Sequence, residues 1–176
     1  GIATTTLGSD TATITFTSTD DGQVGDFSQY MDLVVVSYAR GAVAVVSAQL
    51  NMQLNNDTGT NYDAQNLYGT GSAAAAAVTT GAVRFDIGTL PCANDGANIF
   101  MGAVTTLFDI NSGKYKSGLS QAAYDSDGAG RVHLWAMTWK SQAPITEIDL
   151  YDATGAGDLA AGSMFSLFGV LPRMVA

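Results

Sequence analysis

The chemistry first suggested by residues 124–139, YDSDGAGRVHLWAMTW, is calcium binding, because two aspartates stand two residues apart in a glycine-containing stretch. Asp125 and Asp127 would supply hard carboxylate oxygens. An EF-hand-type loop also requires glycine at its sixth position and a carboxylate at its twelfth, whereas here Gly128 is fourth and Ala136 is twelfth. Aspartate and glycine are equally the residues of a hairpin turn. We therefore predict a turn and no metal or other cofactor. A calcium-stabilised sandwich with its activity elsewhere is one alternative.

Groups that could support catalysis are few in this sequence. Any serine or cysteine nucleophile that relies on an imidazole base would have to use His133, the only histidine. The chain has no Gly-x-Ser-x-Gly elbow, and its only cysteine, Cys92, stands in a Leu-Pro-Cys-Ala segment. A glycosidase needs two carboxyl groups about 5 to 9.5 Å apart, and no local pattern marks such a pair. The carboxylates that folding would have to bring together are Asp57, Asp63, Asp109 and Asp149. We predict that the protein is not an enzyme.

Residues 131–139, RVHLWAMTW, alternate so that two kinds of side chain lie on opposite faces of one strand. One face is small and apolar, and we expect it to pack into the core; it consists of Val132, Leu134, Ala136 and Thr138. The other face is large, aromatic and partly cationic. It consists of Arg131, His133, Trp135, Met137 and Trp139.

Three interpretations of the large face stay open. It is the second side of a buried strand, or a protein interface, since tryptophan, methionine and arginine are typical of contact cores. As a sugar platform, its two tryptophans, about 13 Å apart at strand rise, would stack on pyranose rings. The candidate interface residues are those of the large face, Arg131, His133, Trp135, Met137 and Trp139, with Met174 and Val175 from the tail VLPRMVA.

The charge of the chain excludes several partners. The net charge is −9, from 16 acidic and 7 basic residues, and the basic residues are scattered. Without a basic patch we expect no nucleic-acid binding. No stretch approaches the roughly 20 apolar residues of a membrane helix, so we expect no membrane contact. An acidic surface keeps a protein soluble at high local copy number.

The elements that must position these residues are strands. β-branched and aromatic runs separated by Gly, Asn, Asp and Ser recur about every ten to fifteen residues. They are 11–18, 30–39, 48–54, 62–68, 82–87, 99–109, 114–124, 131–139, 145–151 and 163–170. The alanine-rich GTGSAAAAAVTTGA favours a loop or edge strand over a helix. We predict one all-β domain over residues 1–176, a jelly-roll-like antiparallel β-sandwich of nine or ten strands.

Two of these strands carry more detailed expectations. Residues 30–39 and 48–54 suit neighbouring strands joined across residues 40–46. In the second strand, alternation predicts inward side chains at Leu50, Met52 and Leu54, and outward side chains at Gln49, Asn51 and Gln53.

Five segments, in order, resemble virion proteins of tailed bacteriophages, particularly marine ones. They are ITFTS (14–18) followed by FSQYMDLVVVSYARG; LNNDTGTNY (54–62) before NLYG (66–69); DINSGKYKSGLS (109–120); DSDGAGRVHLWAMTW (125–139) with APITEIDLY (143–151); and GSMFSLFGV (162–170). Together they cover most of the chain. The sequence departs from the pattern at LVVVSYARGAVAVV (33–46), where the family has an exposed-looking aromatic and basic run.

The resemblance implies a non-enzymatic structural protein on the exterior of a phage virion, most simply a capsid decoration protein. Its implied partners are the major capsid protein or other virion proteins, and we expect it to form homo-oligomers. The resemblance implies no catalytic residues. The alternative is a glycan- or receptor-binding module of a phage tail fibre, or a carbohydrate-binding domain. Glycan binding predicts exposed tryptophans, whereas decoration predicts tryptophans buried in the monomer or in a subunit contact.

Overall fold

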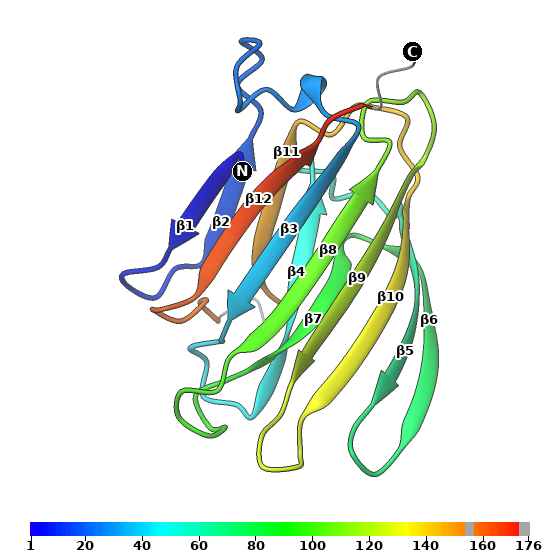
Figure 1. Cartoon of the computed structure of the whole chain (residues 1–176). Coiled ribbons are helices and arrows are strands. Elements are labelled where there is room, and N and C mark those ends of the chain that lie inside the picture. The colour runs from blue at the N-terminus through cyan, green and yellow to red at the C-terminus, as the bar shows by residue number, and fades with distance from the viewer. Residues whose placement is uncertain (154–156, 173–176) are drawn as a thin grey trace.

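The computed structural model describes residues 1–153 and 157–172. It shows an all-β sandwich of two antiparallel sheets (Figure 1). The eight-stranded sheet contains, in order, β1 (Ala3–Thr6), β12 (Met164–Val170), β3 (Asp32–Ala39), β8 (Met101–Phe108), β9 (Lys116–Tyr124), β10 (Arg131–Trp139), β5 (Tyr62–Gly69) and β6 (Ala74–Ala82). The four-stranded sheet contains β2 (Thr13–Thr17), β11 (Glu147–Asp152), β4 (Ser47–Leu54) and β7 (Phe85–Pro91). One short 3-10 helix, η1 (Phe27–Gln29), precedes β3. No helix among the described residues is long and apolar enough to cross a membrane.

The predicted antiparallel β-sandwich is confirmed, but the predicted number of strands was too low. The described residues form twelve strands rather than nine or ten. β1 was missed because its sequence, ATTT, is short and almost wholly exposed, and so lacks the buried alternate positions that mark a strand. The alanine-rich segment is an edge strand, β6, as the sequence favoured.

The core lies between the sheets and follows the alternation of the strands. Leu50, Met52 and Leu54 of β4 are fully buried, as predicted. Asn51, expected to face outward, is also fully buried, and its amide donates to the carbonyl of Phe85 and the carboxylate of Asp86. These two hydrogen bonds offset the cost of burying the amide nitrogen, whereas the side-chain oxygen of Asn51 is buried without a partner among the described residues.

β3 and β4 are not neighbours, contrary to the prediction. β3 pairs with β12 and β8 in the large sheet, whereas β4 pairs with β11 and β7 in the small one. The chain changes sheets directly after Arg40, where the Gly41 N–H donates to the carbonyl of Pro91 at the end of β7. Consecutive strands with short connections usually pair, and nothing local in residues 40–46 distinguishes a hairpin from a crossover.

Residues 125–130 form the turn of the β9–β10 hairpin, as predicted. Asp127 and Gly128 adopt left-handed backbone angles, with φ of 51° and 82°, which both residue types tolerate. The Gly128 N–H donates to the side chain of Asp125. Gly130 packs so tightly that a Cβ would lie 2.0 Å from the carbonyl oxygen of Tyr124. Among the described residues, no group of three or more His, Cys, Asp or Glu side chains is arranged to hold a metal ion.

Candidate functional site

The two faces of β10 are reversed relative to the prediction. Trp135, Met137 and Trp139 point inward and are 2%, 3% and 1% exposed. Val132 and Leu134, expected inside, are 64% and 40% exposed. Both faces of the strand are largely apolar, so alternation alone does not orient it. The larger side chains bury more apolar surface, and β10 lies over β7 on their side.

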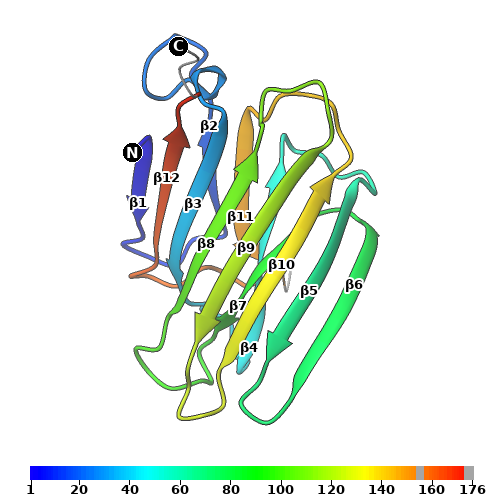
Figure 2. The same ribbon diagram turned by 45° about the vertical axis from the view of Figure 1, so that its right-hand side comes forward.

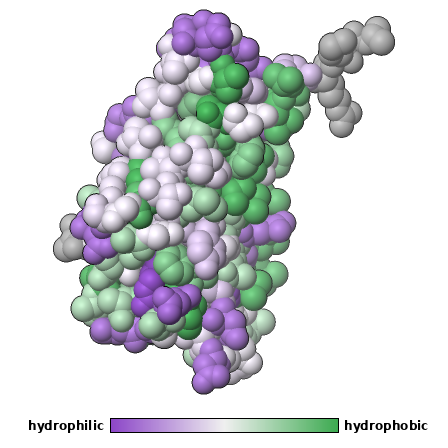
Figure 3. Space-filling view, turned by 60° about the vertical axis from the view of Figure 1, so that its left-hand side comes forward, coloured by the Kyte–Doolittle hydropathy of each residue, from purple (hydrophilic) through white to green (hydrophobic). Residues whose placement is uncertain are grey.

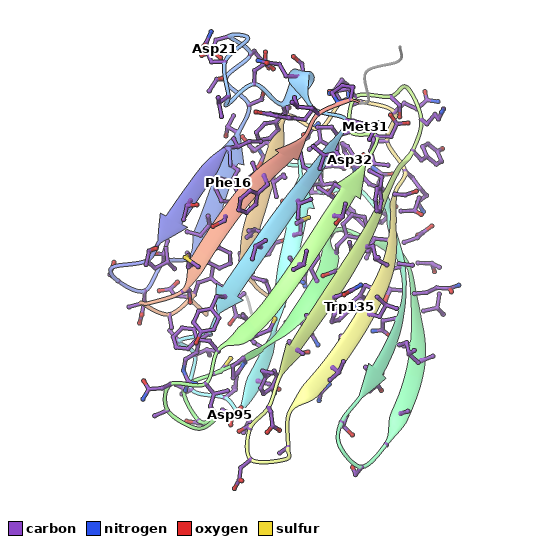
Figure 4. The ribbon with its side chains drawn as sticks, viewed as in Figure 1. Phe16, Asp21, Met31, Asp32, Asp95 and Trp135 are labelled. Carbon is purple, nitrogen blue, oxygen red and sulfur yellow. The ribbon has the colours of Figure 1, made fainter. Side chains whose placement is uncertain are left out.

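The candidate interface residues are therefore mostly interior. His133, Trp135 (Figure 4), Met137 and Trp139 are buried between the sheets, and Arg131 is half-buried at the start of β10. Met174 and Val175 lie outside the described residues. Of the three interpretations of this face, its burial supports the second side of a buried strand. The two tryptophan rings are too deeply buried to form an exposed sugar platform in this monomer.

His133 is a structural histidine in a buried aromatic stack. Its ring lies 4.3 Å from that of Trp135 and 5.3 Å from that of Tyr68, both nearly parallel. Nε2 is 3.2 Å from the hydroxyl of Thr89, and Nδ1 is buried without a hydrogen-bond partner. Burial, with a smaller effect from Arg131, lowers the pKa of His133 to about 4. No carboxylate bonds to this ring in the described chain, so it lacks the orienting partner of a catalytic base.

Acidification should destabilise the protein through His133. The folded state keeps the ring neutral down to a pKa of about 4, whereas the unfolded chain takes up a proton below its ordinary value of 6.5. The free energy of unfolding should therefore fall by roughly 2 to 3 kcal/mol as the pH drops from 7 to 4. Urea unfolding across this range, compared with His133→Gln, measures the effect. An unchanged pH slope in the variant would contradict it.

The outer face of the eight-stranded sheet is a continuous uncharged surface. Strand register aligns its outward side chains in rows. The first row is Thr6, Met164, Tyr38, Gly102, Ala123, Val132, Gly69 and Ala74. The second is Thr4, Ser166, Val36, Val104, Gln121, Leu134, Leu67 and Ala76, and the third is Phe168, Val34, Thr106, Leu119, Ala136, Gln65 and Val78. We call these three rows the outer face.

Exposed apolar side chains concentrate on the outer face. Among the described residues seventeen large hydrophobic side chains are exposed, and eight of them stand here: Tyr38, Leu67, Val78, Val104, Val132, Leu134, Met164 and Phe168. Beyond the third row the strands carry charge again, with Asp63 opposite Thr138 and with Asp32 at the start of β3 (Figure 4). Figure 3, seen from the side of β1, shows strongly hydrophilic residues gathered at the upper and lower ends of the molecule.

The outer face has the dimensions of a protein contact. Eight strands about 4.8 Å apart make it about 34 Å wide, and three rows about 6.7 Å apart make it about 20 Å long. The resulting area of roughly 700 Å² is close to the ~800 Å² that each partner contributes to a standard interface. A shallow groove of about 880 Å³ crosses it from Tyr38 on β3 to Leu67 on β5.

Sequence reasoning missed this surface, although a signal for it exists. Antiparallel sheets commonly have one polar face, which gives alternating apolar and polar residues. β3 reads DLVVVSYA and β10 reads RVHLWAMTW, so both strands are largely apolar on both faces. Such runs in an antiparallel protein indicate a second apolar surface, but which strands share it depends on their order in the sheet.

No family model matches this chain, and no curated protein matches it. Among solved structures it is similar to the CBM40 of the Ruminococcus gnavus IT-sialidase, with 11% identity and a TM-score of 0.32, over 98% of this chain and 94% of that one. The same module bound to α2,6-sialyllactose gives 9% identity and a TM-score of 0.30, over 98% and 94%. A leech intramolecular trans-sialidase gives 12% identity and a TM-score of 0.25, over 85% of this chain and 26% of that one. Similarity this weak carries no inference about what the present chain binds.

Proposed function

We propose that this protein is a non-enzymatic structural subunit on the exterior of a protein particle, and that the outer face holds it there. The observation that carries the proposal is the absence of charge from three rows of a sheet surface in a chain of net charge −9. Sixteen acidic residues are distributed over the rest of the molecule, so the uncharged region is a marked exception. Charged residues are depleted in the same way at the centres of protein interfaces.

The partner in this proposal is an uncharged, apolar protein surface of similar size. Apolar patches on soluble monomers rarely exceed a few hundred Å², and larger ones mark contact sites. Val132, Leu67 and Tyr38 are 64%, 56% and 47% exposed, and each would lose contact with water on docking. Because the patch carries no charge, docking on this side avoids the cost of taking ions out of water.

The particle that we propose is a tailed-phage virion, and the position is that of a capsid decoration protein. The five-segment resemblance supports the virion, and the flat, apolar outer face supports a subunit laid flat on a shell of major capsid protein. The polar loops at both ends of the sheets would then remain in solvent. The glycan alternative loses its predicted platform, because Trp135 and Trp139 are only 2% and 1% exposed.

A charge placed on the outer face should prevent docking. Val132→Lys adds an ammonium at a position 64% exposed in the free protein, so folding is preserved while the contact must bury an unpaired charge. Affinity for particles from which this protein has been genetically removed should fall at least about 30-fold. Val46→Lys is the matched control, because Val46 is 60% exposed in the loop before β4, away from the outer face.

Co-sedimentation of the purified proteins with such particles measures the binding. Wild-type and Val46→Lys proteins should return to regular positions on the shell in electron micrographs, and Val132→Lys should stay in the supernatant. Equal binding by all three proteins would overturn the outer face as the contact. If the added protein binds at the tail instead of the shell in the micrographs, the decoration role would be overturned.

A further inference from the structure

A second concave site lies between the sheets, on the opposite side of the large sheet from the outer face. The hairpin of β5 and β6 forms the edge of the large sheet and extends past β7, the edge of the small sheet (Figures 1 and 2). A cleft of about 380 Å³ opens there between the inner side of the hairpin and the start of β7. This volume lies within the range of small-molecule sites.

Small residues on the edge strand keep the cleft open. Register places Trp135, Asn66 and Ala77 side by side on the inner side of β10, β5 and β6. Trp135 is almost wholly buried and closes the inner end, whereas Ala77 leaves space at the mouth. A larger side chain at position 77 would fill the cleft.

The walls of the cleft carry polar groups, and one of them makes no hydrogen bond within the described protein. The side-chain oxygen of Asn66 is buried and has no hydrogen-bond partner in the described chain. A buried acceptor without a donor costs about 1 to 3 kcal/mol, so a ligand that donates a hydrogen bond to this oxygen would recover that free energy. On the opposite wall stand Arg84 and Asp86, and one carboxylate oxygen of Asp86 accepts from the amide of Asn51 at 2.5 Å.

The charges of the cleft are balanced within it. Burial raises the pKa of Asp86, while the Asn51 hydrogen bond and the Arg84 cation act in the opposite direction. Burial also raises the pKa of the Tyr151 hydroxyl, and the nearby Arg84 cation opposes this increase. The lining in the described chain contains one cation, Arg84, and one aspartate, Asp86, so the cleft has no excess of positive charge to attract an external anion. The cleft therefore suits a neutral ligand with several hydrogen-bonding groups.

We propose that this cleft binds one ring of a neutral, polyhydroxylated ligand, of which a hexose is the simplest example. Hydroxyl groups donate to the Asn66 oxygen and to Asp86 and accept from Arg84. The C–H face of the ring packs against apolar atoms of Val83 and Ala77. This site is independent of the proposed docking role, because the outer face lies on the other side of the sheet and both surfaces can be occupied together.

Titration with neutral sugars, followed by ¹H–¹⁵N NMR, tests the proposal on the full chain. Glucose, galactose, mannose and N-acetylglucosamine serve as probes. At least one should shift the signals of Asn66, Ala77 and Arg84 with a Kd of about 1 to 10 mM, a value expected for one shallowly enclosed ring. The outer-face signals of Val104 and Val132 should not move.

Two leucine variants on the same edge strand provide the control. Ala77→Leu fills the cleft and should weaken the best sugar at least tenfold. Ala76→Leu adds the same group one residue earlier, where the side chain lies on the outer face, and should change the Kd less than twofold. The absence of cleft shifts with all four sugars at about 50 mM would overturn the proposal, as would equal effects of the two variants. Glucuronic acid serves as an acidic probe, and cleft shifts with it but with none of the four neutral sugars would overturn the assignment of a neutral ligand.

Discussion

Replacing Trp139 by alanine should lower the free energy of unfolding by about 4 to 5 kcal/mol, the upper end of the range for a buried aromatic side chain. Trp139 is 1% exposed, and its ring lies 6.5 Å from that of Tyr62. Its removal leaves a large cavity beneath β10. It also removes a hydrogen bond, because the indole Nε1–H donates to the carboxylate of Asp57 at 2.7 Å.

The hydrogen bond between Trp139 and Asp57 also stabilises the turn between β4 and β5. Asp57 also accepts from the Gly59 N–H and the Asn61 amide, and the Tyr62 hydroxyl donates to the Asp57 carbonyl. Burial acts to raise the pKa of Asp57, but hydrogen bonds from Asn61, Trp139 and Gly59 outweigh it and hold the pKa below its usual value. The Asn-Asp-Thr-Gly segment is therefore tied to the core through the indole.

Trp139→Phe separates the two contributions, since it keeps most of the apolar contact and removes the hydrogen bond. Urea unfolding at pH 7 should show a loss of about 1 to 3 kcal/mol for phenylalanine against about 4 to 5 kcal/mol for alanine. A loss below about 2 kcal/mol for Trp139→Ala would show that the packing at this site relaxes and that the core does not depend on the indole.

Replacing Arg40 by alanine should lower the free energy of unfolding by about 3 to 4 kcal/mol, because one guanidinium holds together the connection between β7 and β8, residues 92–100. It donates to four backbone carbonyls, those of Cys92 at 2.6 Å, Gly96 at 2.8 Å, Ile99 at 3.0 Å and Asp95 at 3.3 Å. Hydrogen bonds from a charged donor are each stronger than neutral ones, at about 1.5 to 3 kcal/mol, although they do not add fully.

Arg40→Lys tests whether the shape of the guanidinium matters. An ammonium keeps the charge but cannot reach four carbonyls with a planar fork, so we expect it to recover less than half of the loss. Arg131→Ala is the control, since no hydrogen bond from that side chain is found in the described chain, and it should change stability by less than about 0.5 kcal/mol. Full rescue by lysine, or an equal loss in Arg131→Ala, would contradict the assigned role.

Much of the fold was predictable from the sequence because the residue patterns that indicate strands are local. Alternation located β4 and placed Leu50, Met52 and Leu54 inside, and an Asp-Gly turn marked the β9–β10 hairpin. These features depend on residues that are neighbours in sequence, because interactions within a few residues determine them. The same local physics could not find β1, whose four residues are nearly all exposed.

The sequence by itself determined the class of the protein, most of its strands and its acidic, disulfide-free character. The tertiary structure alone decided which face of β10 is buried, because both faces are apolar and only the position of β7 beneath the strand selects one. It also decided that β3 and β4 lie in different sheets. The outer face joins residues from all eight strands of one sheet, and the cleft joins β5, β6, β7 and β10. Both sites arise from strand order and register, which long-range pairing sets and no short stretch of sequence encodes.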